Sequence, residues 1–302
     1  CLKKAQPITI PSADVNKNLT SLSCVWTVLQ AAKATRYSML INLGGGMVTD
    51  IGGFAAATFK RGINFVNVPT TLLAMVDASV GGKTGINFGG LKNEIGAFAF
   101  PKTVIIDTQW LETLDHENLL SGYAEMLKHG LITERKLLPT LLNFDTATFN
   151  LHQLSDMLKV SVAIKEQIVE QDPHEQGIRK ALNFGHTFGH AFEEWAMTRH
   201  PILHGYAVAY GMVCELYLSA IKQGFPQTIM RQTVNFIRNN YGTLPITCDD
   251  YDALISLMIH DKKNAGNDIN FSLLHDLGSV VINRTATEEE IKDALDFLRE
   301  GV

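Results

Sequence analysis

Residues 40–62, LINLGGGMVTDIGGFAAATFKRG, decide the fold of the first part of the chain. An apolar run enters three consecutive glycines, Gly44, Gly45 and Gly46, and a helix-like stretch follows. Glycines at such a turn let backbone amides approach a phosphate closely, and the helix N-terminus favours an anion. The stretch therefore predicts a strand, a nucleotide-binding turn and a helix, although glycines that only allow tight packing would give the same pattern.

The residues around this stretch alternate between strand-like and helix-like patterns. Residues 15–34 have helical apolar spacing. Short β-branched or apolar runs predict strands at residues 8–11, 38–46, 63–71 and 103–108. Alternation of this kind predicts parallel strands with crossover helices. Thr70 and Thr71 follow one strand, and Asp77 and Lys83 follow in a Gly-rich loop. Polar groups at the carboxyl end of a strand are where an open α/β sheet places its ligand.

After Asp107 the pattern becomes helical. Helices are predicted at residues 119–132, 151–171, 204–224, 226–242, 250–263 and 287–301. We therefore expect an α/β nucleotide-binding domain over residues 1–117, an all-helical domain over residues 118–302, and a cleft between them.

Composition excludes several classes of protein. The 302 residues are 46% hydrophobic, which is enough for two ordinary domains. The net charge of −5 gives no electrostatic footprint for nucleic acid. Four cysteines form no CxxC pair, which favours a reducing compartment. No apolar run reaches the length of a membrane span, and the first residues lack the apolar core of a signal peptide. We expect a soluble, cytoplasmic protein without nucleic-acid or membrane partners.

The stretch that points to chemistry is residues 179–205, RKALNFGHTFGHAFEEWAMTRHPILHG. His186 and His190 are four residues apart, so on a helix both imidazoles project from one face. This spacing fits either a metal site or two histidines packed against the core. Two further residues favour a metal: His204 follows a short loop, and Glu125 lies in an apolar helix-like segment. Imidazoles with one carboxylate and an open position are the ligand set of catalytic zinc.

Seven motifs together resemble the 3-dehydroquinate synthase family. They are GGGMVTDIGGFAAATFKRG (44–62), VPTTLLAMVDASVGGKTGIN (68–87), KNEIGAF (92–98), GYAEMLK (122–128), DPHEQGIRKALNFGHTFGHAFE (172–193), HGYAVAYGM (204–212) and HDKKN (260–264). The resemblance runs in consistent order from Pro11 to Asn264. It implies an amino-terminal NAD-binding α/β domain and a carboxy-terminal helical domain that holds zinc, with cobalt as an alternative. Family members are usually longer at the front, so we expect a truncated amino terminus.

The resemblance also implies an activity. Family members convert 3-deoxy-D-arabino-heptulosonate 7-phosphate to 3-dehydroquinate and phosphate in the shikimate pathway. NAD takes a hydride from a ring hydroxyl, phosphate is eliminated, the hydride returns, and ring opening with aldol closure completes the carbocycle. The metal supplies Lewis acidity and the cofactor carries the redox step. Such an enzyme is a carbon–oxygen lyase.

Site residues follow from the matched motifs. The resemblance assigns the metal to Glu125, His186 and His204, which leaves His190 to contact substrate or relay protons. It assigns NAD to Asp14, Lys17, Gly45, Gly46, Asp50, Thr70, Thr71, Lys92 and Thr113. One departure affects this set: the chain has Ala13-Asp14 where the family usually has Gly-Glu, so the reach of this carboxylate is shorter.

A phosphorylated sugar acid needs several cations. The resemblance assigns its carboxylate to Lys165 and Arg179. The resemblance assigns the substrate phosphate and ring to Lys83, Asn93, Asn183 and Lys263. It assigns the ring hydroxyls of the substrate to Asp77 and Lys128. Adjacent Lys262 could take the place of Lys263, because neighbours on a helix point about 100° apart. Arg61 corresponds to a residue that family members lend across a homodimer interface.

Three other functions are open from sequence. A related cyclase would close another phosphorylated sugar, such as glucose 6-phosphate or sedoheptulose 7-phosphate, but Lys165, Arg179 and Asn183 favour a substrate with a carboxylate. A polyol dehydrogenase would release reduced cofactor. A non-catalytic paralogue would bind NAD without turnover, which the complete set of metal and cationic residues disfavours.

Overall fold

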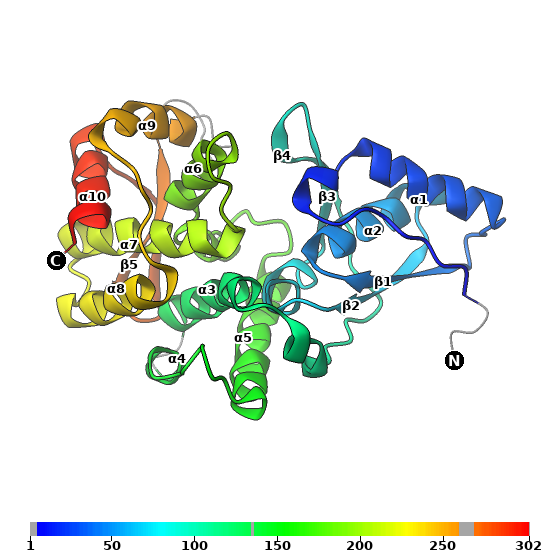
Figure 1. Cartoon of the computed structure of the whole chain (residues 1–302), viewed down its shortest axis with the longest axis horizontal. Coiled ribbons are helices and arrows are strands. Elements are labelled where there is room, and N and C mark those ends of the chain that lie inside the picture. Colours follow the sequence, from blue (N-terminus) through cyan, green and yellow to red (C-terminus); the bar gives the residue numbers. More distant parts are fainter. Residues whose placement is uncertain (1–4, 134–135, 260–268, 302) are drawn as a thin grey trace. The chain divides into compact units, whose positions relative to one another are not determined.

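The computed structural model describes residues 5–133, 136–259 and 269–301 (Figure 1). The chain divides into two compact units, Cys1–Leu114 and Asp115–Val302. No helix among the described residues is both long enough and apolar enough to cross a lipid bilayer.

The first unit is a mixed α/β structure. Its helices are α1 (Leu19–Ala31) and α2 (Gly46–Thr58), and its strands are β1 (Met39–Gly44), β2 (Asn64–Pro69), β3 (Lys83–Phe88) and β4 (Leu91–Phe98). The described residues of this unit also form four short helical turns: η1 (Asp14–Asn16), η2 (Phe59–Arg61), η3 (Ala74–Ala78) and η4 (Thr108–Thr113). The turn η3 is a π-helix, and the other three are 3-10 helices.

Strands β1 and β2 are parallel and are joined through α2, which confirms the predicted strand, glycine turn and crossover helix. Their register runs from Met39 opposite Asn64 to Gly44 opposite Pro69. Helix α2 crosses β1 closely at Gly52, where an added Cβ would lie 1.9 Å from Asn42 Oδ1. The Asn42 amide in turn donates to Asn67 Oδ1 at 2.9 Å, which ties the two strands together beneath the helix.

One predicted strand is wrong, and another is reduced to a single bridge. Residues 8–11 form no strand, and proline, which cannot donate to a strand ladder, occupies positions 7 and 11. In residues 103–108 the pairing is limited to one bridge between Val104 and Asn67. The Gly-rich segment that contains Lys83, expected to be a loop, instead forms the antiparallel hairpin β3–β4. There the Cβ of a residue replacing Gly96 would lie 2.2 Å from Thr84 O, so the glycines allow close strand contact.

The second unit is mainly helical. Its helices are α3 (His116–Ile132), α4 (Leu137–Leu142), α5 (Leu151–Gln171), α6 (His186–Met197), α7 (His204–Gln223), α8 (Gln227–Tyr241), α9 (Tyr251–Ile259) and α10 (Glu288–Glu300). It also contains the 3-10 turns η5 (Ile178–Asn183) and η6 (Cys248–Asp250) and the strands β5 (Asn270–Asp276) and β6 (Ser279–Thr285). The fold class of an α/β domain followed by a helical domain is therefore confirmed, with the antiparallel β5–β6 hairpin as an addition.

Helix α7 lies at the centre of this unit and packs against α3, α6, α8, α10 and β5. Two of its glycines allow the closest of these contacts. An added Cβ at Gly205 would lie 1.9 Å from Ser121 O of α3, and one at Gly211 would lie 1.9 Å from Gly185 O before α6. The first turns of α6 and α7 are thereby brought close to α3.

Candidate metal centre

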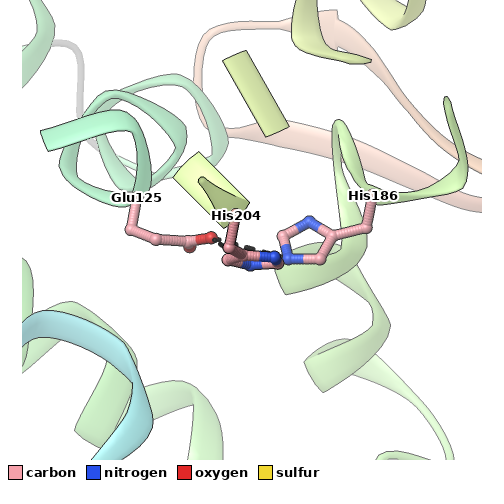
Figure 2. A group of neighbouring side chains, drawn as sticks. All are labelled: Glu125, His186 and His204. Carbon is pink, nitrogen blue, oxygen red and sulfur yellow. Dashed lines mark ion pairs between the residues drawn. The ribbon is translucent and has the colours of Figure 1, made fainter. Parts of the chain in front are cut away.

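Three side chains from three helices of the second unit converge on one point. Figure 2 shows Glu125, His186 and His204 pointing toward one another. One ligand atom from each residue lies within 4.8 Å of the other two. Glu125 Oε1 is 3.5 Å from His186 Nε2 and 3.6 Å from His204 Nε2. This grouping joins residues that are up to 79 positions apart in sequence.

Local packing explains the convergence. His186 and His204 are the first residues of α6 and α7, and Glu125 lies within α3. The Gly205 amide donates to Ser121 Oγ at 3.1 Å, which holds the start of α7 one helical turn from Glu125. Glu215 of α7 is fully buried and accepts from the amides of Gly185, at 2.7 Å, and Thr187, at 3.1 Å. These two bonds hold the backbone on both sides of His186.

Both histidines use Nδ1 for a contact outside the cluster. His186 Nδ1 lies 3.2 Å from Phe184 O, and His204 Nδ1 lies 3.3 Å from Glu193 Oε2. A carbonyl or carboxylate partner at Nδ1 leaves the opposite nitrogen as the ligand atom, and this arrangement is usual for histidines that bind metals. In both rings that opposite nitrogen is the one that faces Glu125.

The electrostatics of the cluster favour a cation. Glu125 is fully buried, and Lys128, one turn along α3, forms an ion pair with its second oxygen. Desolvation lowers the pKa of His204, but the carboxylates of Glu193 and Glu125 outweigh it and raise that pKa to about 10. Two imidazole nitrogens and one carboxylate match the donor set of catalytic zinc. The residues therefore fit a divalent metal ion.

His190 lies beside this cluster. Its ring centroid is 5.4 Å from that of His186 and 6.4 Å from that of His204, and it is not one of the three grouped ligands. The i,i+4 spacing thus places His190 on the same face as His186. A side chain in this position can contact a ligand of the metal or exchange a proton with it.

The anion-binding candidates of the second unit are buried to an unusual degree. Lys128, Lys165 and Arg179 are 1%, 5% and 2% exposed, whereas lysine and arginine are almost never fully buried unless paired. Arg179 Nη1 donates to Pro173 O at 2.6 Å, and Asn183 Nδ2 donates to Glu175 Oε1 at 2.6 Å. Lys262 and Lys263 lie outside the described residues.

A single carboxylate organises the loop before η5. Asp172 accepts from the backbone amides of Gln176, Gly177 and Arg179, at 2.9, 2.7 and 3.1 Å. Although desolvation opposes them, these bonds lower the pKa of Asp172, so the carboxylate stays ionised. Within this loop Glu175 has a positive φ of 59°, a conformation that often marks functional sites.

In the first unit, the structure brings most of the predicted NAD residues into two groups. The first contains charged residues: Lys17 donates to Asp50 and to Asn93, and Lys92 is 3.2 Å from Asp14. Asn87 links these residues. Its side chain donates to Asp14 Oδ2 at 3.3 Å and accepts from the Asn93 amide at 2.9 Å.

The second group surrounds the glycine turn. Gly45 is the N-cap of α2, and an added Cβ on it would lie 3.2 Å from the Thr71 side chain. Thr70 donates its amide to Gly44 O at 3.0 Å, and an added Cβ on Gly46 would lie 3.1 Å from Ala78. The N-terminus of α2 at Gly45 has no side-chain cap and lies beside the Thr71 hydroxyl, which makes it a suitable place for a phosphate.

The remaining predicted residues of the first unit occupy separate elements. Asp77 lies in η3, and Lys83 is the first residue of β3. Thr113 lies in η4, where its hydroxyl donates to Trp110 O at 3.5 Å. Arg61 lies in η2 after the carboxyl end of α2, whereas the glycine turn is at the other end of that helix.

Five residues with structural or electrostatic roles were missed in the sequence: Asn87, Asp172, Glu175, Glu193 and Glu215. A signal existed for Glu193, because it is seven residues after His186 and so lies on the same helix face. Glu215 gives no such signal, because its partners are backbone amides on another helix.

Comparisons with known proteins agree with this description. A family model described as 3-dehydroquinate synthase N-terminal matches residues 7–121, and one described as 3-dehydroquinate synthase C-terminal matches residues 122–264. A 3-dehydroquinate synthase of Parabacteroides distasonis is 55% identical over 300 residues, covering 99% of this chain and 85% of the relative.

Two solved structures are also similar. A 2-epi-5-epi-valiolone synthase from Streptomyces hygroscopicus subsp. jinggangensis, with NAD+ and Zn2+ bound, has a TM-score of 0.86 and 26% identity. A 2-deoxy-scyllo-inosose synthase complexed with carbaglucose-6-phosphate, NAD+ and Co2+ has a TM-score of 0.84 and 25% identity. Each alignment covers 96% of this chain and 81% of the solved chain.

Proposed function

The chain belongs to the 3-dehydroquinate synthase family, and from that premise we propose that it converts 3-deoxy-D-arabino-heptulosonate 7-phosphate to 3-dehydroquinate and phosphate. The observation that carries this proposal is the convergence of Glu125, His186 and His204 beside the buried Lys128, in a chain 55% identical to a 3-dehydroquinate synthase. The reaction is a phosphate elimination with no net redox change.

Two groups supply chemistry that side chains lack. When bound, NAD accepts and returns a hydride, and zinc or cobalt acts as a Lewis acid toward substrate oxygens. We assign the metal to Glu125, His186 and His204. We assign NAD to Asp14, Lys17, Gly45, Gly46, Asp50, Thr70, Thr71, Lys92 and Thr113, in a domain of residues 1–117.

The substrate residues belong to both domains. Buried Lys165 and Arg179 bind the substrate carboxylate, because a cation held in place by the fold loses little entropy on binding an anion. Lys128 and Asp77 hold ring hydroxyls. Lys83, Asn93, Asn183 and Lys263 hold the phosphate and ring, and His190 moves a proton next to the metal. The helical domain of residues 118–302 thus supplies the metal ligands and most of the residues that contact the substrate.

The fold neighbours suggest a second candidate, a cyclase that acts on a different sugar phosphate. Lys165 and Arg179, which the family resemblance assigns to a substrate carboxylate, disfavour it, because neither glucose 6-phosphate nor sedoheptulose 7-phosphate carries a carboxylate. The test is phosphate release from three substrates supplied with NAD and Zn2+: the heptulosonate phosphate, sedoheptulose 7-phosphate and glucose 6-phosphate. We expect turnover only of the first. Faster release from either of the others would select the alternative.

A further inference from the structure

Glu193 is a buried carboxylate that no step of the proposed reaction uses. It lies on α6, seven residues after His186, and is 7% exposed. Its Oε2 is 3.3 Å from Nδ1 of His204, the first residue of α7. Placing a carboxylate in a buried position is costly unless it is paired, and here it is paired with the His204 ring, which itself faces Glu125.

The two histidines of the cluster differ in what meets Nδ1. For His186 the partner is a neutral backbone carbonyl, Phe184 O, whose place is fixed by the chain two residues earlier. For His204 it is a carboxylate on another helix. A carboxylate attracts the Nδ1 proton more strongly than a carbonyl does, so the opposite nitrogen of His204 becomes the more basic ligand.

Orientation is the second effect. His204 side-chain exposure is 27%, against 11% for His186, so packing alone restrains its ring less. The contact with Glu193 supplies a fixed point for that ring and keeps Nε2 directed at Glu125 Oε1, 3.6 Å away.

We propose that Glu193 is a positioning residue of the metal centre, which holds the His204 ring in its ligating orientation and strengthens its Nε2 as a donor. This inference rests on the metal site of the proposed function but not on the identity of the substrate. Loss of an outer partner of this kind lowers metal affinity about 10- to 100-fold.

The test compares Glu193→Gln and Glu193→Ala with Glu194→Gln. Glutamine keeps the size of Glu193 and one acceptor oxygen but removes the charge, and alanine removes both. Glu194 is the adjacent exposed carboxylate and controls for charge on the same helix. Zn2+ affinity is measured by competition with a chelator, the visible spectrum is recorded with Co2+, and thermal unfolding is measured on metal-free protein.

We expect Zn2+ affinity to fall about 10-fold in Glu193→Gln and toward 100-fold in Glu193→Ala, with an altered Co2+ spectrum and little change in the metal-free unfolding temperature. Glu194→Gln should match the wild type. Wild-type affinity in Glu193→Ala would overturn the inference. So would an affinity loss matched by an equal loss of stability in the metal-free protein, because the contact would then be purely structural.

The outcome is separable from that of the proposed function. If wild-type protein binds Zn2+ tightly but releases no phosphate from the heptulosonate phosphate, the proposed substrate is wrong while the role of Glu193 stands. If phosphate is released and Glu193→Gln binds Zn2+ like the wild type, the substrate stands and the role of Glu193 is wrong.

Discussion

At the residue scale, His204 is the ligand whose removal gives the clearest prediction. His204→Ala leaves Glu125 and His186 to hold the ion, and loss of a direct ligand should weaken Zn2+ binding by more than about 100-fold. Activity should fall mainly because the metal is lost. Metal content after gel filtration checks this, with exposed His152→Ala as the control. Stoichiometric zinc retained by His204→Ala would show that the ligand assignment is wrong.

A second residue, Ala13, has a backbone conformation that suits glycine. Its φ of 73° and ψ of 148° are reached at little cost only by glycine, the residue that the family resemblance implies at this position. Ala13→Gly should therefore raise the free energy of unfolding by about 1 kcal/mol, measured by urea denaturation. Ala57→Gly, in the last turn of α2, should lower it instead. A decrease for Ala13→Gly would mean that the strain is not present in solution.

At the scale of elements, the ion pair between α7 and α10 predicts a pH dependence. Lys222 Nζ lies 2.6 and 2.7 Å from the two oxygens of Glu290. That contact, followed by the Thr287 amide, lowers the pKa of the Glu290 carboxyl below its ordinary value of 4.5. Because this pKa is lowered, the contribution of the Lys222–Glu290 ion pair to stability is complete above the unfolded-state pKa of Glu290. It is lost as pH falls through the folded-state pKa of the same carboxyl.

The substitution Glu290→Gln should therefore cost about 1 kcal/mol of unfolding free energy at neutral pH, where it removes the pair and weakens the capping box with Thr287. The difference from wild type should begin to shrink as pH falls below about 4.5 and should disappear once pH is below the folded-state pKa of Glu290, measured by urea denaturation across pH. Exposed Glu289→Gln is the control. A difference that stays constant down to acid pH would exclude the charge as its cause.

The sequence predicted the helix α5 with its bounds but missed the hairpins β3–β4 and β5–β6. Helix α5 was predicted at residues 151–171 and has those bounds, because its buried residues recur at helical spacing through its whole length. The hairpin β5–β6 was missed because Phe271, Ser272, Leu273 and Leu274 are all buried, so β5 has no alternation of exposed and buried positions. The β3–β4 hairpin was missed because its glycines, which allow close strand contact, also suggest a loop.

The metal cluster was predictable for a different reason. His186, His204 and Glu125 are chemically conspicuous residues in apolar surroundings, and the resemblance selected them over His190. The geometry that brings them together depends on Gly205 and Gly211, which touch the backbone of residues far away in sequence. Such contacts leave no periodic pattern. Glu193 shares a helix face with His186, but its contact with His204 is visible only in the structure, and Glu215 has no signal in the sequence.

At the scale of the whole molecule, Arg61 leads us to propose a homodimer with shared sites. Lys60 and Arg61 both have positive φ, 52° and 66°, a costly arrangement for two residues with side chains. Helix α2 has 13 residues and so separates Arg61 from the glycine turn by about 20 Å. These features support Arg61 acting on the substrate phosphate of a neighbouring subunit, as the family resemblance implies.

Complementation tests this proposal. Arg61→Ala and His186→Ala chains should each be nearly inactive alone. After random exchange of equal amounts, about a quarter of all sites should contain both Arg61 and His186, so about a quarter of the wild-type activity should return. Phosphate release by the mixture is the measurement, and native mass spectrometry verifies that subunits have exchanged. A verified heterodimer with no more activity than the separate variants would place Arg61 in its own subunit's site or outside the reaction.

The central claim is that the molecule catalyses a redox-neutral phosphate elimination with NAD as a recycled cofactor. The most direct measurement follows inorganic phosphate and NADH absorbance together while Zn2+-loaded protein acts on the heptulosonate phosphate with NAD. We predict many equivalents of phosphate per enzyme, with NADH never exceeding the concentration of active sites. NADH that grows in proportion to product would contradict the claim and identify a dehydrogenase.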